Sequence, residues 1–368
     1  MGMDKISWWK TDLVNGEAEA AAAAIHACHI SQGPLSQELE TKIAAHIGVR
    51  HAIAVPSGSQ GLLLTMLALG IGPGDEVIVP DMTWIATAHA AALLGAHVVL
   101  VDCLADVPLI DPSKLAAAIT PRTRAIIVVH LAGRSVDMKR VLEIAAERSI
   151  PVIEDAAQAL GSQANGKFLG TTGAMGVYSL GLAKLVACGQ GGIVVCNDDQ
   201  LYEKLKLCSR HGTDSLPAER YHMLGMNMKF SDILAAVALR QWSRIEQKSA
   251  HVRSIYERYR DGLDGIEGIN VLSCDAAGGT VPLWTEIRTH HRNYVIQHLK
   301  SHGVESRPAH MPLHTARHLH SGNIPTDTDF PNATALAHQL LILPSGPDQP
   351  LNNIDRVIDL LRSMEPVR

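Results

Sequence analysis

The sequence predicts an α/β protein whose mostly parallel sheet is covered by helices on both faces, followed by a smaller α+β part. Short apolar runs, typical of buried strands, alternate with longer segments that carry apolar residues at helical spacing. This alternation favours a parallel sheet, because parallel strands need long crossover connections. From about residue 247 the pattern changes to a long amphipathic helix and then short strand-like segments. We therefore expect a large domain over residues 1–246 and a small domain over residues 247–368.

Each expected element is assigned from its own stretch of residues. Strands are expected where short apolar runs end in turn residues, at 51–55, 76–79, 98–102, 125–130, 151–153 and 177–180. Helices are expected where apolar residues recur at helical spacing, at 17–29, 36–46, 60–69, 83–94, 112–119, 138–148, 201–208, 231–247 and 293–302. Residues 331–343 and 354–364 are expected to close the chain as helix and strand segments.

Composition and charge describe an ordinary globular protein. The 368 residues carry a formal net charge of -5 without a basic block, which argues against nucleic acid as a partner. The six cysteines are scattered without a CxxC pair, as expected for reduced thiols in a cytosolic protein. The apolar stretch 86–101 is interrupted by His89 and His97, so we expect no membrane span. Residues 1–17 lack the apolar core of a signal peptide, and the protein is expected in the cytoplasm.

The stretch 150–195 carries the strongest chemical signal. Its first strand ends in two adjacent carboxylates, Glu154 and Asp155, at a position that points into the crevice where α/β proteins bind ligands. Lys184 follows among small and apolar residues, just before the GQGG run at 189–192. A lone lysine that faces a strand-end aspartate fits a lysine that forms a Schiff base with an aldehyde. A solvated surface lysine and a helix-capping aspartate are the alternative.

A phosphate site is expected where the strand 51–55 turns into the next helix. The turn contains Ser57, Gly58 and Ser59, which supply two hydroxyls and a residue without a side chain. The backbone N–H groups at a helix start bind anions, and the glycine permits close approach. An ordinary serine cap is the alternative interpretation of the same turn.

Several segments together resemble one known family. They are EDAAQALG, YSLGLAK and GQGG, with PSGSQGLLLTMLALGIGPGDEVIVPDMTWIATAHAAALLGA before them and LGMNMKFSDILAAVALRQW after them. In this order the segments resemble the DegT/DnrJ/EryC1/StrS aminotransferases, and the match is strongest over residues 31–245. The resemblance implies fold type I, like that of aspartate aminotransferase, and pyridoxal 5'-phosphate (PLP) as the cofactor. Members of this family make amino sugars and aminocyclitols.

The resemblance also assigns roles to residues around the cofactor. It implies that Lys184 holds the PLP aldehyde and that Asp155 keeps the pyridine nitrogen protonated, so that the ring accepts electrons. Trp84 falls where the family stacks an aromatic residue on the ring, although a buried core tryptophan is the alternative. Gln158 resembles the glutamine beside the ring oxygen. Once displaced from the cofactor, Lys184 is also free to act as a general base.

The phosphate of PLP is expected to have protein partners from two chains. Gly58, Ser59 and Ser179 resemble residues that bind it within one chain. Asn227 resembles an asparagine that reaches the phosphate of a neighbouring subunit, which implies a homodimer with shared active sites. A simple turn residue is the alternative for Asn227. The sequence departs from the family pattern in Gly-Gln-Gly-Gly, where Gly-Glu-Gly-Gly is common, and in Leu180, where an aromatic residue is usual.

A histidine-rich stretch, RPAHMPLHTARHLHSG, begins at Arg307. His314 and His318 have the spacing of one helical turn, but the flanking prolines and the absence of a carboxylate or cysteine between them argue against a metal site. We expect a loop in which His310 or His314 contacts substrate hydroxyls or phosphate. A solvated loop without a role is the alternative.

The expected reaction is transamination. L-glutamate, or L-glutamine, is expected to donate its amino group, and a nucleotide-linked keto-deoxyhexose is the acceptor that the resemblance favours. A keto-inositol is the alternative acceptor. Related dehydratases carry histidine in place of the lysine, so Lys184 argues against that activity, and a non-catalytic relative would be expected to lose the cofactor residues.

Overall fold

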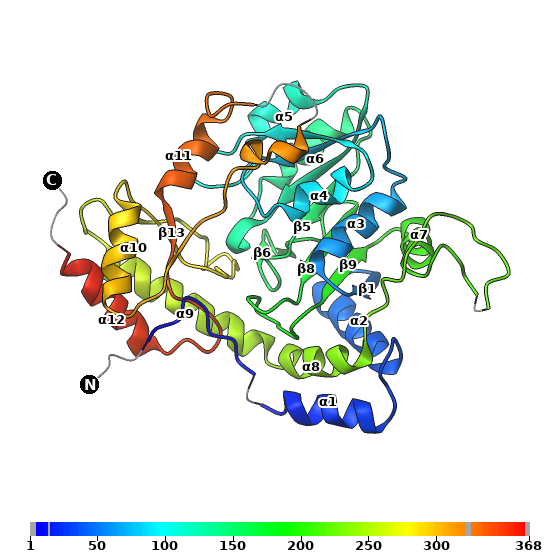
Figure 1. Cartoon of the computed structure of the whole chain (residues 1–368), viewed down its shortest axis with the longest axis horizontal. Helices are drawn as coiled ribbons and strands as arrows, with labels where there is room; N and C mark the ends of the chain where they lie inside the picture. The colour runs from blue at the N-terminus through cyan, green and yellow to red at the C-terminus, as the bar shows by residue number, and fades with distance from the viewer. Residues whose placement is uncertain (1–4, 14, 216, 321–324, 365–368) are drawn as a thin grey trace.

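The computed structural model describes residues 5–13, 15–215, 217–320 and 325–364. Within these residues the chain forms a central seven-stranded sheet, a separate four-stranded sheet and one short hairpin, β6 (Gln163–Ala164) with β7 (Lys167–Phe168). Figure 1 shows α9 (Ile245–Leu263) leading from the central sheet and its helices to the second sheet. No helix in the described ranges has the length and apolar character needed to cross a membrane.

The central sheet is mostly parallel, as predicted. Its strands lie in the order β1-β9-β8-β5-β4-β2-β3, and β9 alone runs antiparallel to its neighbours β1 and β8. The bounds are β1 (His51–Val55), β2 (Glu76–Pro80), β3 (His97–Val101), β4 (Thr123–Val129), β5 (Val152–Asp155), β8 (Met175–Ser179) and β9 (Gly192–Cys196). Parallel pairing aligns Asp155 of β5 with Val177 of β8, so the carboxyl ends of these strands meet at one edge.

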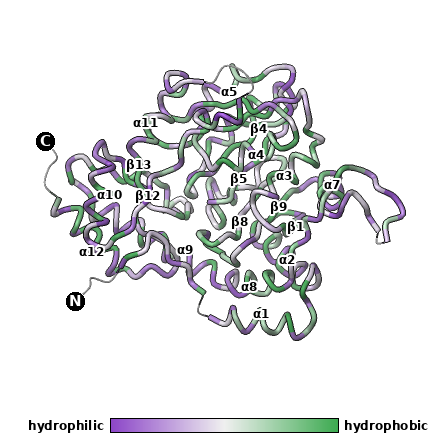
Figure 2. The backbone as a smooth tube through the Cα atoms, viewed as in Figure 1, coloured by the Kyte–Doolittle hydropathy of each residue, from purple (hydrophilic) through white to green (hydrophobic). Residues whose placement is uncertain are grey.

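Helices cover both faces of this sheet because alternate strand residues point to opposite sides. Val77 and Val79 belong to the core beneath α3 (Gly58–Ala68), α4 (Ala86–Ala92) and α7 (Asp199–Ser209). Ile78 faces the other side, together with α5 (Pro112–Ala118) and α6 (Met138–Ala146). The same side is covered further along by α2 (Pro34–Ile47) and α8 (Asp232–Trp242). In Figure 2 hydrophobic segments concentrate in the central strands, and hydrophilic segments follow much of the outer chain.

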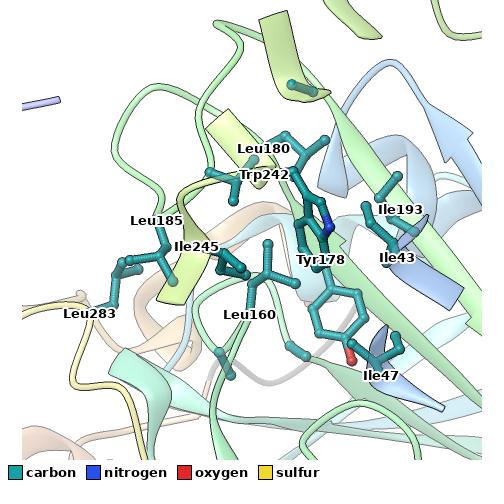
Figure 3. Packing of buried hydrophobic residues seen from close by; sticks show 14 of the residues in the cluster. Ile43, Ile47, Leu160, Tyr178, Leu180, Leu185, Ile193, Trp242, Ile245 and Leu283 are labelled. Carbon is teal, nitrogen blue, oxygen red and sulfur yellow. The ribbon is translucent and has the colours of Figure 1, made fainter. Parts of the chain in front are cut away.

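Two aromatic side chains form the centre of the core between α2, α8 and the sheet. Figure 3 shows Tyr178 of β8 and Trp242 of α8 among aliphatic side chains from several elements. The hydroxyl of Tyr178 donates a hydrogen bond of 2.6 Å to the carbonyl of Leu169, so the one polar atom of this buried ring has a partner. This packing fixes β8, which carries Ser179 at its end.

The second sheet has its own core. Its order is β10-β11-β13-β12, and every neighbouring pair is antiparallel. Its strands are β10 (Asn270–Val271), β11 (Glu286–Arg288), β12 (Arg307–Pro308) and β13 (Leu340–Ile342). Residues of α9, α10 (Arg292–Ser301) and α12 (Leu351–Arg362) pack against Ile287 and Leu341. The chain reaches β13 through α11 (Pro331–Gln339). We propose residue 246 as the boundary between two domains, because α9 leads directly to this sheet.

The N-terminal segment pairs with the C-terminal part of the chain. Residues 5–13 precede α1 (Glu17–His26), and Ile6 and Trp9 form bridges to Val304 and Ser345. The sequence analysis placed this segment with the large domain, and the structure pairs it with residues that flank β12 and β13 of the second sheet. The reason is backbone pairing between residues about three hundred positions apart, which no local pattern reveals.

Some helix boundaries differ from the sequence prediction. The helix predicted over 231–247 is broken at Ser243 and Arg244, and the guanidinium of Arg244 pairs with Asp12 at 2.9 Å and Glu17 at 2.7 Å. The backbone of Arg244, at φ -115° and ψ 16°, lies outside helical geometry at this break. The helix predicted over 83–94 begins only at Ala86, so Trp84 lies in the preceding turn.

Candidate functional site

A cavity of about 700 Å³ lies at the carboxyl edge of the central sheet. The structure brings together most of the predicted site residues around it: Gly58, Ser59, Trp84, Asp155, Gln158, Ser179, Lys184 and His310. Asn227 and His314 are not among the lining residues. The side chains come from elements far apart in sequence, and strand ends at one edge are what bring them together.

Asp155 ends β5 and is buried at the base of the cavity. Its Oδ2 accepts a hydrogen bond of 2.8 Å from the hydroxyl of Thr87, and its Oδ1 accepts one of 3.1 Å from the backbone N–H of Ala157. Burial raises the pKa of Asp155, while the Thr87 hydrogen bond and the charge of Lys184 act to lower it. A buried carboxylate of this kind fits a cationic N–H group as its next partner.

The neighbouring Glu154 has a structural position instead. Its side chain points to the other side of β5 and accepts hydrogen bonds from His130 at 2.8 Å and from the backbone N–H groups of Gly170 and Thr172. Burial opposes ionisation, but these bonds lower the pKa of Glu154 below its usual value. Successive strand residues point to opposite faces, so only one of the two adjacent carboxylates reaches the cavity.

Lys184 lies on the loop between β8 and β9. Burial lowers its pKa to about 8, and the nearby Asp155 acts to raise it. Its Nζ lies 5.3 Å from the centroid of the Trp284 ring. The loop is fixed at Leu182, whose carbonyl accepts hydrogen bonds from the indole of Trp9 at 3.2 Å and the hydroxyl of Thr11 at 2.9 Å. The lysine therefore has a lowered pKa and an anchored backbone.

The N-terminus of α3 opens onto the same cavity. Ser57 caps this helix, and its hydroxyl accepts a hydrogen bond of 3.1 Å from the backbone N–H of Gln60. A Cβ on Gly58 would lie 3.1 Å from the Cβ of Ser179, so glycine lets β8 approach the helix start. A Cβ on Gly192 would lie 2.6 Å from the carbonyl carbon of Ser57, which makes glycine necessary there. The start of α3, Ser59 and Ser179 all line the cavity, and this combination of helix N–H groups and hydroxyls suits a phosphate.

Trp84 is an exposed wall of the cavity. Its side chain is 61% exposed, which excludes the alternative of a buried core tryptophan. The ring lies 6.1 Å, edge-on, from that of His310. An exposed indole beside an apolar cavity leaves a face free for a flat ring.

Gln158 and His310 contact each other across the cavity. The Oε1 of Gln158 accepts a hydrogen bond of 2.7 Å from the backbone N–H of Ala132, which leaves its Nε2 to donate to Nε2 of His310 at 3.3 Å. Burial, together with the positive charge of Lys184, lowers the pKa of His310 to about 4. His310 is therefore neutral at pH 7 and adds no charge to the site.

The two predicted residues outside the cavity have different surroundings. The ring of His314 is buried, with Nδ1 2.7 Å from Asp81 and Nε2 3.0 Å from Asp327, so both nitrogens have carboxylate partners. This geometry offers no free nitrogen to a substrate. Asn227 is exposed in the segment that follows α7, where its Oδ1 accepts a hydrogen bond of 3.4 Å from the backbone N–H of Lys229.

Sequence reasoning assigned no site role to four residues of the site, and it favoured an anchor of the terminus over a substrate shield for one of them, Trp8. Thr87 supports Asp155, and Trp8, Trp284 and Arg307 form part of the cavity wall. The sequence spacing could have identified Thr87. It lies three residues after Trp84, about one turn along the predicted helix, and is therefore expected to face the same side. The other three come from the N-terminal segment and the second sheet, and they reach the cavity only through tertiary pairing.

Comparison with known proteins places the chain in one family. The model of the DegT/DnrJ/EryC1/StrS aminotransferase family matches residues 12–362. The chain is 34% identical over 334 residues to dTDP-3-amino-3,4,6-trideoxy-alpha-D-glucose transaminase of Streptomyces venezuelae, covering 90% of this chain and 87% of the relative. It is 37% identical over 339 residues to GDP-perosamine synthase of Caulobacter vibrioides, covering 90% of each.

Solved structures agree with this placement. The crystal structure of S. venezuelae DesV superposes with a TM-score of 0.93 at 31% identity, covering 99% of this chain and 100% of that one. That of 3-amino-5-hydroxybenzoic acid synthase gives a TM-score of 0.88 at 27% identity, with the same coverage. The predicted family and the fold-type I architecture are confirmed, and with them the prediction of an aminotransferase. The chain belongs to the DegT/DnrJ/EryC1/StrS family of PLP-dependent aminotransferases.

Proposed function

We propose that the protein binds PLP in the cavity and moves an amino group from L-glutamate or L-glutamine to a nucleotide-linked keto sugar. The observation that carries this proposal is the shared cavity of Lys184 and Asp155, with the N-terminus of α3 opening onto it. These three features match the three functional groups of PLP: an aldehyde, a ring nitrogen and a phosphate. Of the residues predicted to bind the cofactor, all but Asn227 line this cavity.

The residues present fit the cofactor chemically. Asp155 is a buried carboxylate whose pKa is raised by burial, and a protonated ring nitrogen would supply the positive partner that keeps it ionised. Ser59, Ser179 and the N–H groups at the start of α3 would hold the phosphate, and Trp84 would pack on the ring. When bound, PLP accepts the amino group from the donor and passes it to the carbonyl carbon of the acceptor.

Lys184 would do the proton chemistry. The pKa of Lys184 is about 8, close to neutral pH, so its amine both accepts and donates protons readily. Gln158 and the neutral His310 supply hydrogen-bonding groups without charge on the same wall. Trp284 packs near the lysine and keeps water from that side.

The choice of a nucleotide sugar as acceptor rests on the relatives. One relative is named for a dTDP-linked amino sugar and another for GDP-perosamine. The cavity volume of about 700 Å³ is within the range of small-molecule sites and accommodates a cofactor with a sugar beside it. A keto-inositol is the alternative acceptor, and a screen of both substrate classes would distinguish it from a nucleotide-linked keto sugar.

We also propose a homodimer in which Asn227 completes the partner's site. The segment around Asn227 exposes Tyr221 by 72%, Leu224 by 74% and Met226 by 46%. Large apolar side chains gathered on one exposed segment are typical of a protein interface. Together with the exposed position of Asn227 itself, this favours contact with a second copy.

The test is the visible absorption spectrum of the purified protein with PLP, before and after adding L-glutamate or L-glutamine. Covalent attachment to Lys184 should give a visible band that one donor removes, and the variant Lys184→Ala should lack the band while keeping the circular dichroism of the folded protein. Transamination by Lys184→Ala at the normal rate would overturn the proposal. Trp84→Ala should retain the band and bind PLP more weakly, because it removes only a packing surface.

A further inference from the structure

The cavity wall holds few charges for its size. Among its lining residues in the described part of the chain, the charged side chains are Asp155, Lys184 and Arg307. The proposed function assigns the first two to the cofactor. Because His310 is neutral at pH 7, Arg307 is the cation that remains for a substrate.

Arg307 is held in place by elements of the second sheet. It begins β12, where it pairs with Ile342 of β13, and its guanidinium carbon lies 4.1 Å above the ring of Trp8. Trp8 is itself fixed, since its backbone N–H donates to Glu305 at 3.4 Å and its ring lies 6.2 Å from that of Trp284. Stacking on an indole orients a guanidinium without using its N–H groups.

The N–H groups of Arg307 have no acceptor in the described structure. Glu305, two residues away, pairs with Lys5 at 2.7 Å. The charge of Arg307 helps to lower the pKa of Glu305, but none of the ion pairs among the described residues includes Arg307. Such a group is solvated in the free protein and is available to a ligand. A planar guanidinium with free N–H groups binds oxyanions in a bidentate manner more strongly than an ammonium does.

We propose that Arg307, stacked on Trp8, is the oxyanion receptor for substrates at the mouth of the cavity. This inference rests on the proposed function, because both proposed substrates carry oxyanions: the carboxylates of the amino donor and the diphosphate of the nucleotide sugar. The two arrive in turn and one cation can serve both. Arg307 would then help to select which amino acids and which sugar carriers enter the site.

The experiment measures equilibrium binding to the PLP-loaded protein and its variants. Probes are glutarate for the donor carboxylates, inorganic pyrophosphate for the diphosphate, and dTDP and GDP for the complete carriers. Affinity is followed by calorimetry and by quenching of tryptophan fluorescence. Arg307→Gln should weaken at least one class of probe by about tenfold to a hundredfold, the effect of losing a charge-assisted hydrogen bond. The affinity of Arg307→Lys should lie between those of the native protein and Arg307→Gln. Trp8→Leu should lose less affinity than Arg307→Gln, because it removes only the stacking partner.

Arg317→Gln is the matched control, because Arg317 lies on the same loop and does not line the cavity. It should leave all probe affinities unchanged. Weaker binding of glutarate alone would mean that Arg307 binds the amino donor. Weaker binding of pyrophosphate and the nucleotides alone would mean that it binds the acceptor. Weaker binding of both classes would mean that it acts in both half-reactions. If Arg307→Gln binds every probe as the native protein does, the inference is wrong. The visible PLP band should persist in Arg307→Gln, because Arg307 does not hold the cofactor. If the native protein itself shows no such band, the proposed function is wrong, and this outcome is distinct from a failure of the Arg307 inference.

Discussion

His314 gives Asp81 two hydrogen bonds of 2.7 Å, one from its backbone N–H and one from Nδ1 of its ring. Asp81 follows β2 and precedes Trp84, whereas His314 belongs to the loop 307–320 that carries His310. Both segments contribute to the cavity wall. The pair therefore joins the wall built by the central sheet to the wall built by the second sheet. The ring of His314 is further fixed by stacking on Phe330, with centroids 5.0 Å apart.

Replacing this histidine should destabilise the protein mainly at low pH. Burial acts to lower the pKa of His314, but its bonds to Asp81 and Asp327 outweigh burial and raise the pKa above 6.5. A raised pKa means that the stabilisation is complete below the unfolded value and is lost as the pH rises through the folded value. We expect His314→Asn to lower the free energy of unfolding by about 2 kcal/mol at pH 6 and by less at pH 9.

Urea unfolding at the two pH values checks this, and KM for the amino donor gives a second measurement. Because the pair positions the loop 307–320, KM should rise more than kcat falls. His26→Asn, at an exposed position of α1, is the control and should change neither quantity. An equal loss of stability at pH 6 and pH 9 would show that the charge on His314 contributes nothing.

Lys184 should capture PLP with an unusually low pH midpoint. Only the neutral amine attacks an aldehyde, and the pKa of Lys184 is about 8 because the side chain is buried. The rate of attachment to the cofactor-free protein should therefore rise up to about pH 8 and level off above it. An ordinary lysine would still gain rate near pH 10, and that result would contradict the prediction. Asp155→Asn should move the midpoint lower, since the carboxylate acts to raise this pKa.

Thr87 should contribute to PLP affinity through Asp155 without contacting the cofactor. Its hydroxyl donates 2.8 Å to Oδ2 of Asp155, and removing it leaves a buried carboxylate with one hydrogen bond fewer. Thr87→Val should raise the PLP dissociation constant about tenfold, as expected for a hydrogen bond to a charged group. Thr87→Ser keeps the hydroxyl and should bind PLP nearly as the native protein does. Equal affinities for the serine and valine variants would remove Thr87 from the site.

The sequence predicted the parts of the site that local pattern determines. Asp155 was placed at a strand end because the apolar run stops there, and the structure agrees. Ser179 was placed inside a strand predicted over 177–180, whereas the observed strand ends at Ser179. Gly58 and Ser59 were placed at a helix start by turn chemistry. The cofactor roles of these residues came from the family resemblance and stay predictions for this chain.

The remainder depends on contacts between distant residues. Asp81 and His314 are 233 positions apart, and neither residue type indicates the other. Where β9 begins, Gly192 leaves room for the backbone of Ser57, and this is a steric requirement between segments far apart in the sequence. His314 was predicted to contact substrate on composition alone, which gave no information about the buried carboxylates around it.

The pairing of the N-terminal segment has a consequence for synthesis on the ribosome. Trp8 and Trp9 are synthesised about three hundred residues before their partners Glu305 and Ser345. Synthesis proceeds at about 5–20 residues per second, so the segment waits on the order of tens of seconds before it can pair. Two tryptophans are exposed during that time and are candidates for chaperone binding. Because Trp9 also bonds the carbonyl of Leu182, the loop of Lys184 should be anchored, and the cofactor held stably, only after Ser345 has been synthesised.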